Sequence, residues 1–524
     1  MPGSPDTMPK GVKKLKDNKW YSALLRRRLL VALLLLIQLV AFVLTVIYSG
    51  RFYSVITTTL TVISLITALC ILTTDSAGPF KLTWIFVILT VPLFGGVIYI
   101  WFKLQSHTRR FDRRLTQVRK YTSPMYSLPG EAYDPACHAA GAHMPQVRYL
   151  EKHAGFPVYD NTETEYYVSG EAKFEALKRE LEKAEKYIFI EYFIIQEGVM
   201  WDAVLEILKR KAAEGVEIRV IYDDMGCFLK LPKNYAKRLR DMGIKCIVFN
   251  PFRPVFTAIQ NNRDHRKIVS IDGKVAFTGG VNLADEYINA CRKFGHWKDT
   301  AILLRGSAAW SLTLMFLEMW AVAGNTAEEY DRFYPGDMPA LPASGYVQPY
   351  CDSPMDRENV SEQLYLSILA HAHDYVYICT PYLIIDETMS SALTLAAKSG
   401  VDVRIITPHI PDKKVVHATT RSHYNELVSA GVRIYEYSKG FIHSKTFVCD
   451  DRIATVGTAN LDFRSLYLHF ECGTCLYGCN SVADIKQDFL DTLPSCIEMT
   501  PDQFKLTSRN RLLRAILRLY SPLM

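Results

Sequence analysis

The sequence predicts an α/β protein made of two similar α/β/α halves, packed about a pseudo-two-fold axis and preceded by N-terminal transmembrane helices. Three observations predict this fold: long uncharged stretches near the N-terminus, an internal repeat, and alternation of short apolar runs with helical segments in each copy. A chain of 524 residues is too long for one ordinary core. Its 49% hydrophobic and 22% charged residues fit a globular part joined to a membrane part.

The predicted membrane region covers residues 29–103. Its three uncharged stretches, 29–50, 52–74 and 82–102, are each long enough to cross a hydrocarbon core of roughly 30 Å as a helix. Residues 1–28, of cytoplasmic type, carry eight Lys/Arg and two Asp, and the predicted linker 104–149 begins equally basic. The positive-inside rule places both flanks on one side, whereas three crossings would separate them, so the number of crossings stays open.

The predicted globular part consists of two copies, 150–335 and 340–505, joined by a segment rich in Pro and Gly at 331–345. The first copy contains "AEKYIFIEYFII" and then "AAEGVEIRVIYDD". The second contains "AHDYVYICTPYLII" and then "AAKSGVDVRIITPH". Each pair reads as two buried strands with a helix between them, which predicts a right-handed parallel crossover.

One motif, H-x-K-x4-D, occurs in both copies at the same place in the repeat. It comprises His265, Lys267 and Asp272 in the first copy, and His443, Lys445 and Asp450 in the second. A G-[GT]-x-N segment follows each motif, with Gly280 and Asn282 in the first copy and Thr458 and Asn460 in the second. A single H-x-K would carry little information, but two copies inside a structural repeat indicate a shared site.

The spacing of the motif predicts its geometry. In a strand, residues i and i+2 point the same way, so each His shares a face with its Lys while Arg266 and Ser444 face away. Asp272 and Asp450 fall where a hairpin turn is expected, so a structural role explains them at least as well as a catalytic one. Asp299 and Glu471, a short way beyond the motifs, are candidates to orient the imidazoles.

Two His, two Lys and two Asn converging on one point suit a phosphodiester. The ammonium groups and amides would neutralise its oxygens, with backbone at Gly280 and Thr458 approaching the phosphate. One imidazole could attack phosphorus and the other could transfer the proton of the alcohol. This chemistry requires no metal or other cofactor. The CxxC at residues 472–475 has no second ligand pair, so it reads as buried strand rather than as a zinc site.

With these motifs, the chain resembles the phospholipase D superfamily and, within it, the bacterial cardiolipin synthases. Strings such as "NNRDHRKIVSIDGKVAFTGGVNLADEYI", "YEYSKGFIHSKTFVCDD" and "GTANLDFRS" carry the resemblance, which extends from about residue 80 to the C-terminus. It implies a multi-pass protein of the bacterial cell membrane that converts two phosphatidylglycerol molecules into cardiolipin and glycerol. It also implies that His265 is the nucleophile and His443 the proton shuttle, an order that the residues alone leave open. His469 stands where the resemblance leads us to expect Asn.

The remaining expectations concern partners. Phosphatidylglycerol and other anionic phospholipids are the expected partners, and the tail 506–524 reads as a basic amphipathic helix for a membrane interface, with docking on the domain as the alternative.

The competing activity is a phospholipase D-type hydrolysis, or another phosphatidyl transfer, at the same residues. A nuclease or a non-enzymatic scaffold fits less well, because the chain has an anchor and both complete motifs; no nucleic acid is expected. The sequence leaves the oligomeric state open.

Overall fold

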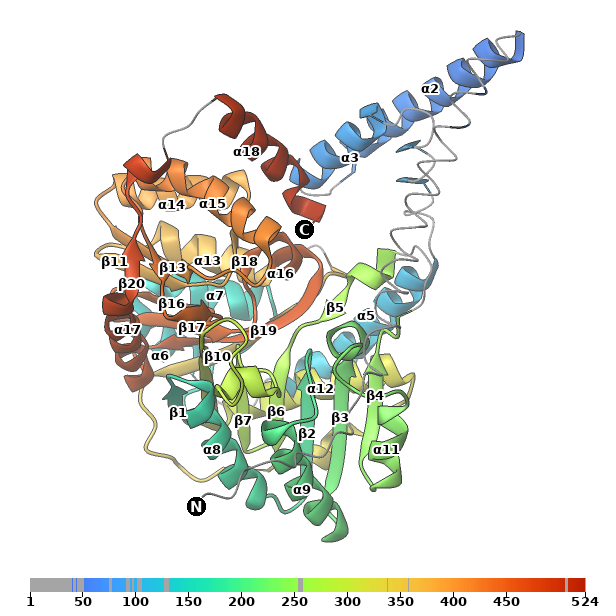
Figure 1. Ribbon diagram of the computed structural model, residues 1–524. Helices are drawn as coiled ribbons and strands as arrows, with labels where there is room; N and C mark the ends of the chain where they lie inside the picture. The colour runs from blue at the N-terminus through green and yellow to red at the C-terminus, as the bar shows by residue number, and fades with distance from the viewer. Residues whose placement is uncertain are drawn as a thin grey trace, which may run out of the picture. The chain divides into compact units, whose positions relative to one another are not determined.

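The structure is a computed structural model that describes residues 40, 44, 51–74, 78–90, 95–96, 99–100, 106–126, 132–252, 258–336, 338–356, 358–504 and 508–523. The chain divides into two compact units: residues 1–74 with 85–100, and residues 75–84 with 101–524. The predicted stretch 29–50 lies outside the described residues, apart from two positions. The larger unit holds both copies of the repeat (Figure 1).

The hydrophobic N-terminal region is helical where it is described. Helix α2 spans Arg51–Leu72 and α3 spans Gly78–Thr90. Among the described residues, no helix combines the length and the apolar character needed to cross a membrane. Several large apolar side chains of α2 are nevertheless exposed, among them Val55, Leu65 and Leu69.

The first copy of the repeat forms a seven-stranded sheet with the order β1-β9-β7-β6-β2-β3-β4. Its strands are β1 (Thr162–Tyr167), β2 (Tyr187–Tyr192), β3 (Glu217–Asp223), β4 (Lys245–Phe249), β6 (Lys267–Ile271), β7 (Val275–Gly279) and β9 (Ala301–Gly306). Strands β2, β3 and β4, at one side of the sheet, are parallel to one another, and the other neighbouring pairs are antiparallel. The predicted parallel pairing is therefore confirmed, with α9 (Val199–Ala213) between β2 and β3 in the chain.

The second copy repeats this order as β10-β19-β17-β16-β11-β13-β14 and adds β20 (Cys496–Glu498) at the edge. Its strands are β10 (Tyr346–Asp352), β11 (Tyr375–Cys379), β13 (Asp402–Pro408), β14 (Arg433–Tyr437), β16 (Thr446–Cys449), β17 (Ile453–Gly457) and β19 (His469–Tyr477). Helix α14 (Glu387–Lys398) makes the matching crossover from β11 to the parallel β13. The fold is thus a mixed α/β repeat.

Helices cover both faces of the first sheet because side chains alternate along each strand. Phe189 of β2 belongs to the core formed with α12 (Ala308–Gly324), whereas Ile188 and Ile190 belong to the core formed with α8 (Gly170–Glu182) and α9. The other helices of the larger unit are α5 (Ser106–Tyr126), α6 (Tyr133–Ala140), α7 (Met144–Lys152), α10 (Asp224–Cys227), α11 (Tyr235–Asp241), α13 (Val360–Ala370), α15 (Lys414–Ser429), α16 (Phe463–Tyr467), α17 (Asn480–Thr492) and α18 (Ser508–Tyr520). The predicted linker 104–149, where it is described, contains α5, α6 and most of α7.

Two short parallel pairings join the halves. In each of them, a short strand of one half pairs with a strand of the other half. The first half contributes β5 (Arg263–Asp264), which pairs with the start of β19. The second half contributes β15 (Gly440–Ile442), which pairs with β8 (His296–Lys298) of the first half. A histidine of the repeated motif follows β5 and β15 directly, so these exchanges determine what each histidine contacts.

The tail helix α18 contacts the domain. Arg518 forms an ion pair of 2.9 Å with Glu426 of α15 and donates to the carbonyl of Ser422. Leu512 and Ile516 stay exposed on the same helix. The helix therefore contacts the domain through Arg518 and keeps apolar side chains exposed. Its predicted role at a membrane interface stays a prediction.

Candidate active site

Each motif histidine is fixed by a backbone hydrogen bond to the other half of the molecule. The His265 amide donates to the carbonyl of Phe470 at 2.9 Å, extending the pairing of β5 with β19. The His443 amide donates to the carbonyl of Lys298 at 2.7 Å, extending the pairing of β15 with β8. Each histidine is therefore held at the place where the two halves exchange a strand.

The carboxylates predicted to orient the imidazoles are paired with them crosswise. His265 Nδ1 lies 2.9 Å from both carboxylate oxygens of Glu471, which belongs to the second half. His443 Nδ1 lies 2.7 Å from Oδ2 of Asp299, which belongs to the first half. Both carboxylates are fully buried. A carboxylate only accepts, so each holds the proton on Nδ1 and leaves the Nε2 lone pair available for attack.

The motif lysines lie beside their histidines, as the i, i+2 spacing predicts. Lys267 Nζ donates to the carbonyl of His265 at 2.6 Å, and Lys445 Nζ contacts the carbonyl and Nδ1 of His443. Both side chains are buried. Burial lowers the pKa of Lys267, and it lowers that of Lys445 to about 7, with Asp299 opposing and Lys267 reinforcing the shift. A bound anion would stabilise the charged ammonium groups and so reverse this effect.

The surroundings of both imidazoles lower their pKa and so favour the neutral form near pH 7. Burial lowers the pKa of His265 well below its ordinary value, and the charges of Lys267, Lys445 and His443 lower it further. Burial and Lys445 also lower the pKa of His443, to about 4, although Asp299 opposes them. These mutual effects place the four groups in one electrostatic site. Binding of an anion would raise both pKa values and let one imidazole carry a proton.

Residues Arg266 and Ser444, expected to face away from the site, do so. Arg266 pairs with the buried Glu191 and with Asp264. Ser444 Oγ lies 2.8 Å from Thr300 Oγ1. The alternation predicted from strand period is therefore confirmed at both motifs.

The motif aspartates, for which the sequence allowed a catalytic or a structural role, bind backbone amides. Asp272 accepts hydrogen bonds of 2.8 Å from the backbone amides of residues 185–187, and Asp450 accepts three from residues 373–375. Both have positive φ, 54° and 51°, in the turns that join β6 to β7 and β16 to β17. Their carboxylates thus hold the loop before the central strand of each sheet. This placement favours the structural alternative.

The residues Gly280 and Thr458, predicted to bind the phosphate, contact the orienting carboxylates. A Cβ at Gly280 would come within 2.0 Å of Asp299 Oδ1, so the missing side chain makes room for that carboxylate. The Thr458 hydroxyl donates to Glu471. Both residues therefore support an orienting carboxylate, at equivalent positions of the repeat, and their contact with a phosphate stays a prediction.

The two asparagines are buried near the motifs but already make protein contacts. Asn282 Nδ2 donates to the hydroxyl of Tyr287 at 2.7 Å, and its Oδ1 accepts from the amide of Ile194. Asn460 Nδ2 donates to Asp462 at 3.1 Å. Each amide group has two N–H donors, so one remains for a ligand oxygen.

Sequence reasoning missed several side chains around the site. Lys173 of α8 is buried, donates to the Tyr192 hydroxyl at 2.8 Å, and has a pKa lowered to about 7 by burial. It takes a position on the apolar stripe of its helix, a signal that could have identified it. Aromatic rings form the walls: Phe193 lies 5.0 Å from the His265 ring, and Trp297 lies 5.5 Å from the His443 ring.

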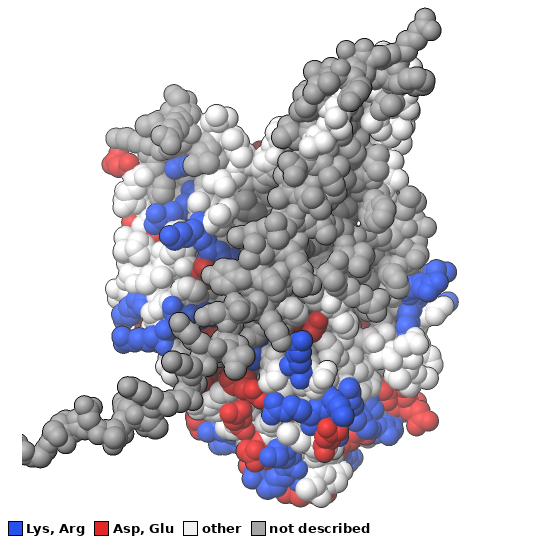
Figure 2. All heavy atoms as spheres, turned by 45° about the vertical axis from the view of Figure 1, so that its right-hand side comes forward, with Lys and Arg blue, Asp and Glu red and all other residues white. Residues whose placement is uncertain are grey.

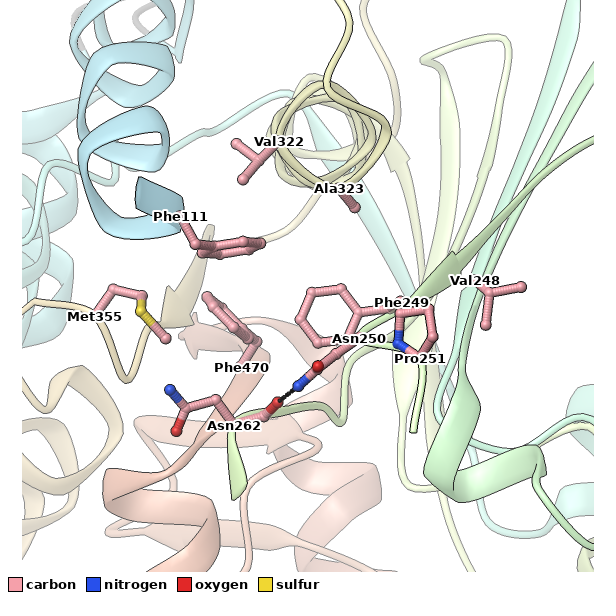
Figure 3. A pocket seen from close by; sticks show the side chains of 10 residues that line it. All are labelled: Phe111, Val248, Phe249, Asn250, Pro251, Asn262, Val322, Ala323, Met355 and Phe470. Atoms are coloured by element: carbon pink, nitrogen blue, oxygen red, sulfur yellow. Dashed lines mark hydrogen bonds between the residues drawn. The ribbon is translucent and has the colours of Figure 1, made fainter. Parts of the chain in front are cut away.

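The reverse side of β19 is apolar. His469 and Glu471 face the motif histidines, while Phe470, between them, points into a cavity of about 190 Å³ that it shares with Phe111 of α5 and Phe249 (Figure 3). At its edge, the side-chain amide of Asn250 donates a hydrogen bond of 2.9 Å to the backbone carbonyl of Asn262. The aromatic packing holds the start of β19, and with it Glu471, against the helix that precedes the first half.

The family of the chain follows from comparisons with known proteins. A model described as "Cardiolipin synthase, PLD-like domain" matches residues 177–295 and 365–493, which contain the two motifs. Cardiolipin synthase 2 of Bacillus anthracis is 35% identical over 87% of this chain and 89% of its own. An uncharacterized protein of Streptococcus mutans is 45% identical over 84% of this chain and 96% of its own.

A solved structure supports the fold. The crystal structure of phosphatidylserine synthase from Haemophilus influenzae Rd KW20 is 14% identical and matches 72% of this chain and 97% of its own, with a TM-score of 0.55. At this identity the likeness concerns the fold alone. Taken with the matched motifs and the length of the matched relatives, the chain belongs to the cardiolipin synthase family of phosphatidyltransferases, within the phospholipase D superfamily.

Proposed function

We propose that this chain makes cardiolipin and free glycerol from two molecules of phosphatidylglycerol, through a covalent intermediate on His265. The observation that carries the proposal is the pairing of two buried imidazoles with two carboxylates, beside two buried lysines. Such a site matches a phosphodiester. The lysines balance its negative charge, one imidazole can attack phosphorus, and the other can protonate the ester oxygen that leaves.

In the first step, Nε2 of His265 attacks phosphorus and the bond from phosphorus to the glycerol head-group oxygen breaks. Protonated His443 gives its proton to that oxygen, so glycerol leaves as a neutral alcohol. Glu471 accepts the Nδ1 proton of His265 in its hydrogen bond and stabilises the charge that develops on the ring. Lys267 and Lys445 balance the charge on the phosphoryl oxygens.

In the second step, His443 takes the proton from a hydroxyl of the second phosphatidylglycerol. The resulting oxygen attacks phosphorus, the bond to His265 Nε2 breaks, and cardiolipin is released. The proton that His443 gave in the first step is regained in the second, so the cycle is balanced. Burial lowers the pKa of His443 to about 4, so the anionic substrate must raise this pKa before the first step.

The supporting groups have defined roles in this proposal. Asn282 and Asn460 offer their remaining amide protons to phosphoryl oxygens, Gly280 and Thr458 support the orienting carboxylates, and Asp272 and Asp450 fix the motif turns. We assign the two repeat copies to residues 150–335 and 340–505, with residues 506–524 as an interfacial tail.

The proposal includes attachment to the bacterial cell membrane through residues 29–103. Exposed apolar side chains on α2 support it, because water disfavours such surface and lipid does not. Thr59 and Thr67 also turn their hydroxyls back to carbonyls of their own helix, at 2.7 Å, which satisfies polar atoms without water. Crossing by several helices is the finer form of this proposal.

The second candidate is hydrolysis by the same residues, with water in place of the second lipid. A nuclease fits less well: among the described residues that Figure 2 shows, Lys and Arg are interspersed with Asp and Glu rather than gathered in one basic stripe. Membranes containing the chain would be incubated with labelled phosphatidylglycerol, with and without chelator, beside His265→Ala. Cardiolipin with glycerol, absent in the variant, supports transfer; phosphatidic acid refutes it in favour of hydrolysis.

A further inference from the structure

A third histidine shares the carboxylate of the proposed nucleophile. His469 is buried, and its ring centroid lies 5.5 Å from that of His265. Its Nδ1 lies 3.6 Å from Oε1 of Glu471, the same carboxylate that lies 2.9 Å from His265 Nδ1. The resemblance to the bacterial cardiolipin synthases led us to expect Asn at this position.

The ligand atoms of His265, His469 and Glu471 all lie within 4.8 Å of one another. Two imidazoles and one carboxylate are a ligand set that zinc takes in proteins, with a fourth position left open. Bonds of about 2.0–2.1 Å in a tetrahedron separate neighbouring ligands by about 3.3 Å. The separations of 2.9 and 3.6 Å from Glu471 bracket this value.

A second observation points to a ligand here. Among the described residues, His469 Nδ1 has no hydrogen-bond partner although it is buried. Its Nε2 accepts from Arg464 Nε at 3.3 Å, which directs Nδ1 toward Glu471. A buried ring nitrogen that lies near a carboxylate, but beyond hydrogen-bond distance of it, is an arrangement that a metal ion would complete.

We propose that His265, His469 and Glu471 bind a divalent transition-metal ion such as Zn²⁺, and that this ion inhibits the enzyme reversibly. The ion would take the lone pairs of both Nδ1 atoms. The proton of His265 Nδ1 would then move to Nε2 of the same ring. The proton of His469 Nδ1 would likewise move to its own Nε2, which breaks the hydrogen bond that Arg464 donates there, so neither ring loses a proton. With a proton on Nε2, His265 has no lone pair there to attack phosphorus.

The surrounding charges set the strength of binding. Lys267, Lys445 and Arg464 lie beside the site and oppose a dication. Binding should therefore be weaker than at a closed structural zinc site and reversible by a chelator. Imidazole ligands favour zinc and copper over magnesium or calcium, so the latter two should not inhibit.

The test uses the full chain, stripped of metal with a chelator, in detergent micelles. Zn²⁺ binding is measured by competition with a chromophoric zinc indicator, and cardiolipin formation is measured against free Zn²⁺. The variant is His469→Asn, and the matched control is His423→Asn, which changes another buried histidine outside the cluster. Thermal unfolding with and without Zn²⁺ shows that each variant is folded and whether the ion stabilises it.

We expect the wild type and His423→Asn to bind one Zn²⁺, to be stabilised by it and to lose activity until chelator is added. In His469→Asn, Zn²⁺ affinity should fall at least about tenfold, and inhibition should shift by the same factor. Equal affinity in His469→Asn and wild type would overturn the proposal. So would loss of binding in Cys449→Ser instead, since His143, Cys449 and the half-buried Asp450 form a separate cluster of possible metal ligands.

The inhibition arm rests on the proposed function, but the binding and unfolding arms do not. If the chain makes no cardiolipin yet binds Zn²⁺ through His469, the function fails and the site stands. If it makes cardiolipin and Zn²⁺ does not bind, the site fails and the function stands.

Discussion

Replacing Glu471 by Gln tests whether the crosswise carboxylate controls the nucleophile. The substitution keeps the shape of the side chain and removes its charge. Glu471 is fully buried, and both of its oxygens lie 2.9 Å from His265 Nδ1. Because the Thr458 hydroxyl donates to the same group, the amide oxygen of Gln would turn toward Thr458 and its NH₂ toward His265.

An NH₂ facing Nδ1 makes that nitrogen an acceptor and moves the ring proton to Nε2. The imidazole would then hold the tautomer that does not attack. In a catalytic triad, the equivalent loss of the orienting carboxylate lowers kcat by about 10⁴. We expect a fall in kcat of about 10³ to 10⁴, or about 4 to 5.5 kcal/mol of barrier, with little change in KM.

The assay is the initial rate of cardiolipin formation from phosphatidylglycerol in mixed micelles, with thermal unfolding as the control for folding. A kcat within a few-fold of wild type in a folded Glu471→Gln protein would refute the reasoning. A double-mutant cycle on stability then tests the crosswise partner. His265→Ala and Glu471→Gln should couple by about 0.5–3 kcal/mol, whereas His265→Ala and Asp299→Asn should be nearly additive.

Three further predictions follow from single contacts. Asp450→Asn should lower the free energy of unfolding by about 2 to 4 kcal/mol near neutral pH, because three amides lose a charged acceptor. Burial would raise the pKa of Asp450, but its hydrogen bonds outweigh burial and lower it, so denaturant unfolding should show the difference above about pH 4 and its loss as pH falls further. Lys445, whose pKa burial lowers to about 7, should make kcat/KM fall as pH rises through that value, and Lys445→Arg should abolish this limb of the pH profile. Gly280→Ala should lower kcat about 10²-fold by displacing Asp299, while Gly78→Ala, whose Cβ meets nothing within 4 Å, should leave the rate unchanged.

The repeat and the local geometry of the motifs could be predicted from the sequence because both depend on short-range periodicity. Strand period determined that His265 and Lys267 share a face and that Arg266 does not. The turn at Asp272-Gly273 could be predicted because a hairpin turn with two successive positive φ angles favours the pair Asp-Gly. The φ angles of these two residues are 54° and 69°. These features need no knowledge of which strands meet.

The partners of the site residues could not be predicted in this way. Glu471 follows His265 by 206 positions, and only the pairing of β5 with β19 brings them together. Gly280 and Thr458 look like ligand-contacting residues from the sequence because small residues permit close approach. Which group approaches them depends on the tertiary structure, and in this chain a carboxylate of the protein lies against each of them.

The two half-sites are related by the repeat but differ chemically, and the difference bears on which imidazole attacks. Glu471 accepts from the Thr458 hydroxyl and has His469 beside it, whereas Asp299 accepts from the Thr300 amide and has Gly280 behind it. Additional donors withdraw charge from Glu471 and fix its position, which favours a histidine that must hold one tautomer through a covalent step. Asp299 has fewer side-chain donors and lies near Lys445, which suits a histidine that must gain and lose a proton. Because each carboxylate acts on the histidine of the other half, neither half contains a complete site, and this favours retention of both copies in one chain.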